Sequence, residues 1–244
     1  MESIKRNLMQ KKGVLYLIPT PLGDDNAHET LITGLAALLN SIATFVVEDE
    51  RTARRFLRKA GFTNSFDTTQ LHVLNEQTKE AETLAYLATA ENGHDIGLVS
   101  EAGLPCIADP GALIVARAHS RNIKVIPLPG ASSIILALIA SGFNGQNFAF
   151  NGYLPIDKVD RAKKIKDLES RMIREKQTQI FMETPYRNLS LLETIMKTCL
   201  PDTRLCVACD LTQTTELIIS ATIAQWRKRE LPALHKRPAV FLLG

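Results

Sequence analysis

Two turns rich in glycine and proline constrain the fold of this chain more than any other feature of its sequence. The first turn spans residues 100–111 (SEAGLPCIADPG) and the second spans residues 127–133 (PLPGASS). Each turn follows a short apolar run and precedes apolar residues at helical spacing. Glycine lets a ligand approach the backbone closely, and ligands of open α/β sheets bind where strands end and helices begin. The turns therefore predict an enzyme site for a nucleotide-like small molecule.

The remaining pattern predicts an α/β fold in two domains. Short apolar runs alternate with helical patterns up to a glycine-rich boundary at residues 141–145, which indicates a parallel, doubly wound sheet in an N-terminal α/β domain, residues 13–145. Residues 146–244 mix strands with short connections and form a predicted C-terminal α+β domain. Residues 1–12 are polar and basic, and we expect a disordered segment there.

Three expectations concern single segments of the N-terminal domain. Helical spacing predicts helices over residues 28–40 and 76–90, with Leu84 and Leu87 on the inner face of the second. Residues 62–74 are polar and interrupted by Thr and Asp, so we expect irregular structure there.

Composition limits the class of protein. Hydrophobic residues make up 45% and charged residues 23% of the 244, enough for a packed core and too few charges for a disordered chain. No secretory signal or run of about 18 apolar residues is present, so we expect a cytoplasmic protein with free thiols and no membrane span. Cys206 and Cys209 have the spacing of zinc ligands, but an offset of three in a strand puts them on opposite faces, so we expect no metal.

The familiar nucleotide and metalloprotease motifs are absent from the sequence. It contains no G-x-G-x-x-G after a strand, no P-loop and no H-E-x-x-H, which disfavours a nicotinamide enzyme or a P-loop phosphotransferase. Glu48, Asp49 and Glu50 stand instead at a predicted strand end beside Arg51. These carboxylates fit either a base or substrate anchor, or an acidic helix start. Ser132 and Ser133 open the next helix, where hydroxyls and amides can bind polar ligand groups.

Basic residues cluster in three places. Residues 158–176 contain eight Lys or Arg and four Asp or Glu, which fits a solvated helix face or a nucleic-acid contact. The short basic tracts at 227–229 and 235–237 could belong to the same surface, but little aromatic interleaving accompanies them, so base stacking is unsupported. The predicted helix after Glu50 would present a third basic surface, made of Arg51, Arg54, Arg55, Arg58 and Lys59.

Several motifs together resemble one family. They are Thr20-Pro-Leu-Gly23, Val47-Glu-Asp49 with Arg51-Thr52, the first turn, the second turn, Gly152-Tyr-Leu-Pro155, Glu183-Thr-Pro-Tyr-Arg187 and Asp210-Leu-Thr212. In this order they resemble the tetrapyrrole (corrin/porphyrin) methylase superfamily, and within it the ribosomal RNA small-subunit methyltransferase I type. The chain ends at Gly244, so we expect it to lack the C-terminal segment typical of those RNA enzymes.

The resemblance implies a homodimer that binds S-adenosylmethionine in a cleft between its two α/β domains. It implies methyl transfer to ribosomal RNA of the small subunit, at a ribose 2′-hydroxyl. A tetrapyrrole or other small-molecule acceptor, and a non-catalytic cofactor-binding homologue, are the alternatives. Glu48, Asp49 and Arg51 are the candidates for positioning or deprotonating the acceptor. The cofactor contacts carried over from the family are Pro21, Ala102, Gly103, Leu104, Ile107, Ser132, Ser133, Glu183 and Ala221.

Overall fold

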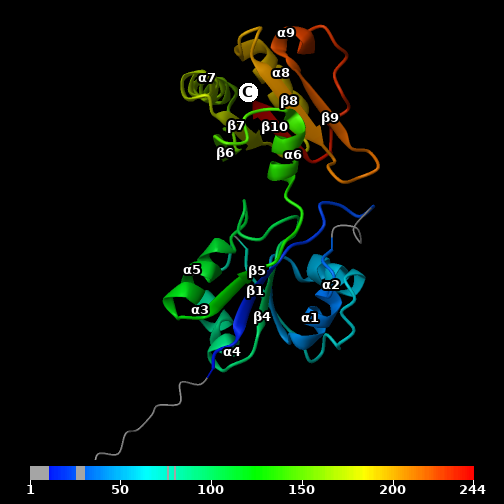
Figure 1. Cartoon of the computed structure of the whole chain (residues 1–244), viewed down its shortest axis with the longest axis vertical. Helices are drawn as coiled ribbons and strands as arrows, with labels where there is room; N and C mark the ends of the chain where they lie inside the picture. Colours follow the sequence, from blue (N-terminus) through cyan, green and yellow to red (C-terminus); the bar gives the residue numbers. More distant parts are fainter. Residues whose placement is uncertain (1–10, 26–30, 76, 80) are drawn as a thin grey trace, which may run out of the picture. The chain divides into compact units, whose positions relative to one another are not determined.

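Strands and helices alternate along the chain and assemble into two sheets. The computed structural model describes residues 11–25, 31–75, 77–79 and 81–244 (Figure 1). Most of the expected disordered segment, 1–12, therefore lies outside the described residues. In the described part of the chain, no helix is long and apolar enough to cross a membrane.

The chain divides into two units, each with its own sheet. The first unit contains the residues up to Pro21 and the stretch 27–131. The second unit contains the short segment 22–26 and Ser132–Gly244. The boundary was expected between residues 145 and 146. One helix that precedes this point is instead grouped with the second unit. This helix, α6 (Ser133–Ser141), packs on three strands of the second sheet, which explains its place there.

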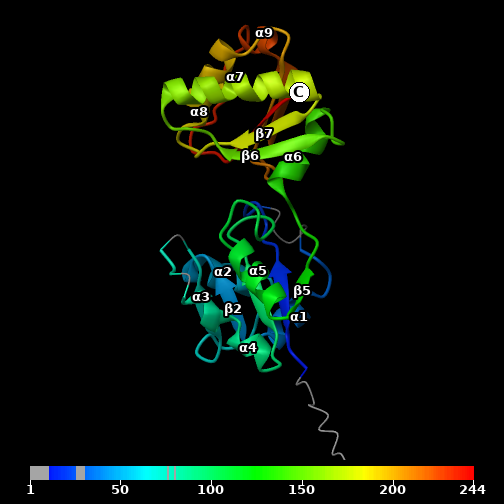
Figure 2. The same ribbon diagram turned by 90° about the vertical axis from the view of Figure 1, so that its left-hand side faces the viewer.

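The first unit is built on a parallel five-stranded sheet in the order β3-β2-β4-β1-β5, as the alternating pattern predicted. Successive residues of its inner strands point to opposite faces. Phe45 packs with α1 and α2 on one face, whereas Val46 packs with α5 on the other. Both faces are covered by helices, as Figure 2 shows. The elements are β1 (Val14–Ile18), α1 (Leu35–Ser41), β2 (Thr44–Val47), α2 (Glu50–Lys59), β3 (Gln70–Val73), α3 (Thr83–Tyr86), α4 (Ala88–Glu91), β4 (Ile96–Val99), α5 (Ala112–Ser120) and β5 (Lys124–Pro127).

The first unit differs from expectation in three segments. β3 lies in the stretch expected to be irregular, and it pairs along its whole length with the buried strand β2. The helix expected over residues 76–90 is instead the two short helices α3 and α4, and Leu84 is 48% exposed while Leu87 is buried. The helix expected from residue 28 begins at Leu35, after Gly34 with a positive φ of 83°; residues 26–30 lie outside the described residues.

The second unit is built on a mixed sheet in the order β6-β7-β10-β8-β9. β6 and β7 are parallel, and the other neighbours are antiparallel. One face packs against α7, α8 and α9, and the other against α6. The elements after α6 are β6 (Phe148–Tyr153), α7 (Lys158–Glu175), β7 (Thr178–Met182), α8 (Asn188–Thr198), β8 (Arg204–Cys209), β9 (Leu217–Thr222), α9 (Ile223–Trp226) and β10 (Ala239–Leu243).

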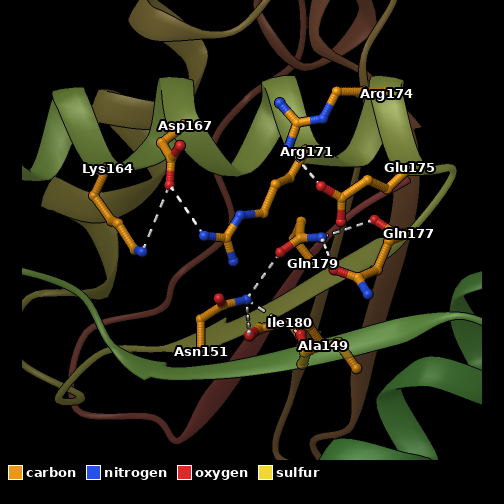
Figure 3. A network of polar contacts seen from close by, with 10 residues as sticks. All are labelled: Ala149, Asn151, Lys164, Asp167, Arg171, Arg174, Glu175, Gln177, Gln179 and Ile180. Carbon is orange, nitrogen blue, oxygen red and sulfur yellow. Dashed lines mark hydrogen bonds and ion pairs between the residues drawn. The ribbon is translucent and has the colours of Figure 1, made fainter.

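A bulge in the β6–β7 pair is held by side-chain amides. The register shifts between Phe150 and Tyr153, and the Asn151 amide donates to the backbone carbonyls of Ala149 and Ile180 (Figure 3). The same amide also donates to the side chain of Gln179, which is fully buried. The bulge is therefore a satisfied feature of this sheet edge.

Candidate functional site

The carboxyl ends of the parallel strands in the first unit bring three loops together. The loop after β1 and the loop after β4 form a two-residue bridge, because Thr20 and Gly103 exchange both backbone hydrogen bonds at 3.0 Å. The Ser100 hydroxyl donates to the Gly103 carbonyl at 2.6 Å. Gly103 has a φ of 79°, which favours glycine. Pro21 is the next residue after this bridge, so the structure brings it to the Ala102-Gly103-Leu104 turn.

The second turn packs against the same loops. A Cβ added to Gly130 would lie 2.3 Å from the Cβ of Pro19 and 3.8 Å from a methyl carbon of Leu104. Only glycine permits this approach, because side chains at 2.3 Å would clash. The two turns rich in glycine and proline are thus neighbours at the carboxyl ends of the strands of the first sheet.

One carboxylate that the sequence analysis missed organises the first turn. Asp109 accepts the Cys106 amide on both oxygens at 2.8 Å and the Gly111 amide at 2.7 Å. Cys106 and Ala108 have positive φ values of 70° and 60°, a costly conformation that these bonds help to maintain. The Asp-Pro-Gly sequence is a turn signal that could have suggested this role. Ile107, at the tip, is 43% exposed.

Glu48 and Asp49 have different environments although they are adjacent. Asp49 is the N-cap of α2: it accepts the Thr52 amide at 2.8 Å, and this bond lowers the pKa of its carboxyl. Glu48 is partly buried and accepts the Glu101 amide at 3.4 Å. Burial raises the pKa of Glu48, and the nearby carboxylates of Asp109 and Glu101 add to the effect.

These environments separate the roles the two residues can take. A carboxylate with a raised pKa accepts a proton more readily than one with a lowered pKa, and an N-cap carboxylate is already occupied by its helix. The Thr52 hydroxyl donates to the Glu101 carboxylate at 3.2 Å and so links the start of α2 to the loop after β4. The sequence analysis did not single out Thr52 as a site residue. Arg51 is exposed in the first turn of α2.

The other cations of α2 are partly occupied. Arg54 pairs with Glu50 at 3.2 Å and lies 4.9 Å from the Phe66 ring centroid. Arg58 donates to the Phe62 carbonyl and also stacks on Phe66. Arg51 and Arg55 are also exposed cations of this helix.

The remaining predicted cofactor residues belong to the second unit. Ser132 is buried and caps α6 by accepting the Ile135 amide at 3.4 Å, and Ser133 is the first residue of that helix. Glu183, which directly follows β7, is buried. One of its carboxylate oxygens accepts from the Thr184 amide and the Arg187 guanidinium, and the other has no hydrogen-bond partner among the residues that the structure describes. That orphaned acceptor fits a ligand that carries an amino or hydroxyl donor.

Ala221 lies apart from these residues. Its side chain packs on the core under α7 and α8, whereas the neighbouring Ser220 donates to a carbonyl at the end of α6. Only the backbone of Ala221 is therefore available on the α6 side of the sheet.

The basic helix α7 has mostly local partners. Asp167 pairs with Lys164 at 3.7 Å and with Arg171 at 4.0 Å (Figure 3). Arg161 is buried and donates to hydroxyls of α8. These contacts favour the interpretation of α7 as a solvated helix that packs on its own sheet.

The two cysteines with zinc-like spacing lie in the strand β8. Cys206 packs with α6 and Cys209 with the opposite core, which confirms that they face opposite sides of the sheet. Within the ranges that the structure covers, no three His, Cys, Asp or Glu residues are grouped so that they could hold a metal ion.

A family model supports the resemblance seen in the motifs. The model of the tetrapyrrole (corrin/porphyrin) methylases matches residues 14–226. The chain belongs to this family. Tetrapyrrole methylases transfer methyl groups from S-adenosylmethionine, so the chain is an S-adenosylmethionine-dependent methyltransferase.

Individual relatives and structures agree with the family. The chain is 34% identical to the ribosomal RNA small subunit methyltransferase I of Escherichia coli O157:H7, over 90% of this chain and 73% of that protein. It is 35% identical to the protein of the same name from Bacillus subtilis, over 87% of this chain and 68% of that one. The crystal structure of the methyltransferase CobJ matches with a TM-score of 0.62 and 16% identity, over 95% of this chain and 94% of that chain, and so supports the fold.

Proposed function

We propose that this methyltransferase modifies RNA of the small ribosomal subunit, at a ribose 2′-hydroxyl. The observation that carries the proposal is the identity of 30–35% over most of the chain to proteins named for that substrate. The exposed cations Arg51 and Arg55 support it, since an RNA substrate is held largely through its phosphates. We also propose a cytoplasmic homodimer, as the family resemblance implies; light scattering of the purified protein tests the dimer.

We propose that loops of the first unit contribute to binding the methyl donor. Pro21, the Ala102-Gly103-Leu104 turn and Ile107 are the proposed contacts from this unit. Ser132, Ser133, Glu183 and Ala221 of the second unit are proposed as cofactor contacts because the family resemblance implies them. S-adenosylmethionine supplies a methyl group on a sulfonium, a leaving group that needs no further activation. Catalysis by the chain is therefore mainly a matter of aligning the acceptor.

Glu48 is the proposed acceptor of the proton that the ribose hydroxyl releases. Its raised pKa and partial burial suit it better than Asp49, which caps α2. Arg51, the second residue of α2, is proposed to position a phosphate next to the target ribose. Asp49 retains an indirect part, since it fixes the first turn of the helix that carries Arg51.

A transfer assay tests the function. Small ribosomal subunits from a strain without this protein are incubated with the enzyme and methyl-labelled S-adenosylmethionine. We expect label in the RNA, in a dinucleotide that resists alkali, because a 2′-O-methyl group blocks cleavage there. Label on a base would overturn the ribose assignment. Label only in a porphyrin-like acceptor would overturn the RNA substrate, and cofactor binding without transfer to any acceptor would indicate a non-catalytic homologue.

A further inference from the structure

Two loops far apart in the sequence form one surface in the second unit. The loop after β7 and the loop before β10 meet because these strands are paired. The Lys236 amide donates to the Pro185 carbonyl at 3.1 Å, and the Asn188 side chain donates to the Arg237 carbonyl at 2.7 Å. Lys236 has a φ of 63°, so the second loop is fixed in an uncommon conformation.

An exposed aromatic ring lies on these loops beside basic side chains. Tyr186 is 69% exposed, more than a ring that contributes to a core. His235 meets it edge to face with ring centroids 5.8 Å apart, and the Lys236 ammonium is 5.9 Å from the ring centroid. We call these three residues the Tyr186 platform.

Hydrogen bonds from a buried carboxylate hold the loop beneath the platform. Glu183 is buried and accepts both the Thr184 amide and the Arg187 guanidinium at 2.6 Å. The bond between Glu183 and Arg187 joins residues on either side of Tyr186. A ring held on such a loop loses little conformational entropy when it binds a planar partner.

The charges around the platform favour an anion. Glu183 is paired with Arg187, and Asp210 is paired with Arg237 at 2.7 Å. In the part of the chain that the structure describes, no ion pair joins a carboxylate to Lys236. An aromatic face next to an uncompensated cation is the combination with which proteins bind single-stranded nucleic acid.

We propose that the Tyr186 platform binds an unpaired nucleotide of the RNA substrate, with the base stacked on Tyr186 and the neighbouring phosphate beside Lys236. The inference rests on the proposed function, because it presumes an RNA substrate. It adds a contact that the chain's basic tracts alone did not suggest, since the aromatic residue and the cation come from separate loops.

Matched variants of the whole chain test the platform. Tyr186→Ala should weaken binding of a small-subunit RNA fragment by about tenfold, the effect of losing one stacked base, and raise KM for RNA with little change in kcat. Tyr186→Phe keeps the ring and should bind like the unchanged protein. Tyr153→Ala is the control, because Tyr153 is 58% exposed on β6 of the same unit. Lys236→Ala should weaken binding and reduce its salt dependence.

Each other outcome overturns the inference in a recognisable way. If the unchanged protein methylates RNA and Tyr186→Ala binds it equally well, the platform is wrong and the proposed function stands. If Tyr186→Ala weakens S-adenosylmethionine binding in calorimetry, the ring belongs to the cofactor site. If concentrated Tyr186→Ala sediments as a smaller species than the unchanged protein, the ring contacts a second copy. If the unchanged protein neither binds nor methylates RNA, the proposed function fails and the platform fails with it.

Discussion

At the scale of single residues, Glu48 gives the clearest pH prediction. Burial raises its pKa, so the folded state binds a proton more tightly than the unfolded state does. Its contribution to the free energy of unfolding therefore falls as pH rises from the unfolded pKa through the folded pKa. Glu48→Gln should then be more stable than the unchanged protein at neutral pH and equally stable at acid pH, as measured by urea unfolding. The kcat of this variant should fall while its S-adenosylmethionine affinity is retained. If Glu48→Gln were more stable than the unchanged protein at acid pH as well, the stability gain would not come from the ionisation of Glu48.

Asp49 should behave as a helix cap rather than as a base. Asp49→Ala removes the acceptor for the Thr52 amide, so both thermal stability and activity should fall. Asp49→Asn and Asp49→Ser keep a capping oxygen and should restore most of both. Thermal unfolding and methyl transfer measured on the three variants check this. An Asn variant that is stable and inactive would show instead that the Asp49 charge takes part in catalysis.

The residues of the site were predictable to different degrees. The glycines of the two turns were recognised because a left-handed or crowded backbone leaves a clear mark in sequence, as at Gly103 and Gly130. The opposite pKa shifts of Glu48 and Asp49 were not predictable, because they depend on the burial of Glu48 and on the Thr52 amide that Asp49 accepts, which only the fold supplies. The Tyr186 platform was missed for a similar reason, since its ring and its cation are distant in sequence.

At the scale of elements, the first turn depends on one side chain. Asp109→Ala would leave the Cys106 and Gly111 amides without their acceptor and release two residues with positive φ. A charged hydrogen bond contributes about 1.5–3 kcal/mol, so S-adenosylmethionine should bind roughly ten- to a hundredfold more weakly. Calorimetric titration measures this, and Asp109→Asn, which keeps one oxygen, should show a smaller loss. Unchanged affinity in Asp109→Ala would remove this turn from the cofactor site.

Secondary structure was predictable where a pattern is long or strongly periodic. The alternation of strands and helices gave the parallel sheet, because buried parallel strands are continuous apolar runs. β3 (QLHV) is short, half polar and at the sheet edge, so its strand conformation depends on pairing with β2. Helix α6 follows a loop that resembles its neighbours in the first unit, and only its packing shows that it belongs to the second sheet.

At the scale of the whole molecule, the formal net charge of +3 does not identify the substrate. The placement of the cations is more informative. Those of α7 largely pair with their own helix or its neighbours, whereas Arg51 and Arg55 on α2 are exposed. The formal charge points the same way, because α2 has five Lys or Arg and one Glu, whereas the longer α7 has seven Lys or Arg and four Asp or Glu. We therefore expect α2 rather than α7 to make the phosphate contacts of an RNA substrate.

Paired charge reversals distinguish these two helices. Arg51→Glu with Arg55→Glu should abolish methyl transfer to small ribosomal subunits and lower the slope of log affinity against log salt by about 1.4–1.8, the value for two lost phosphate contacts. Lys163→Glu with Lys164→Glu on α7 is the matched control, with the same change in charge, and should leave transfer within about twofold, the effect typical of a solvated surface. S-adenosylmethionine affinity, measured separately, should be retained in both. If the α7 pair abolishes transfer and the α2 pair does not, the RNA contacts lie on α7; if neither matters, phosphate binding by these helices is excluded.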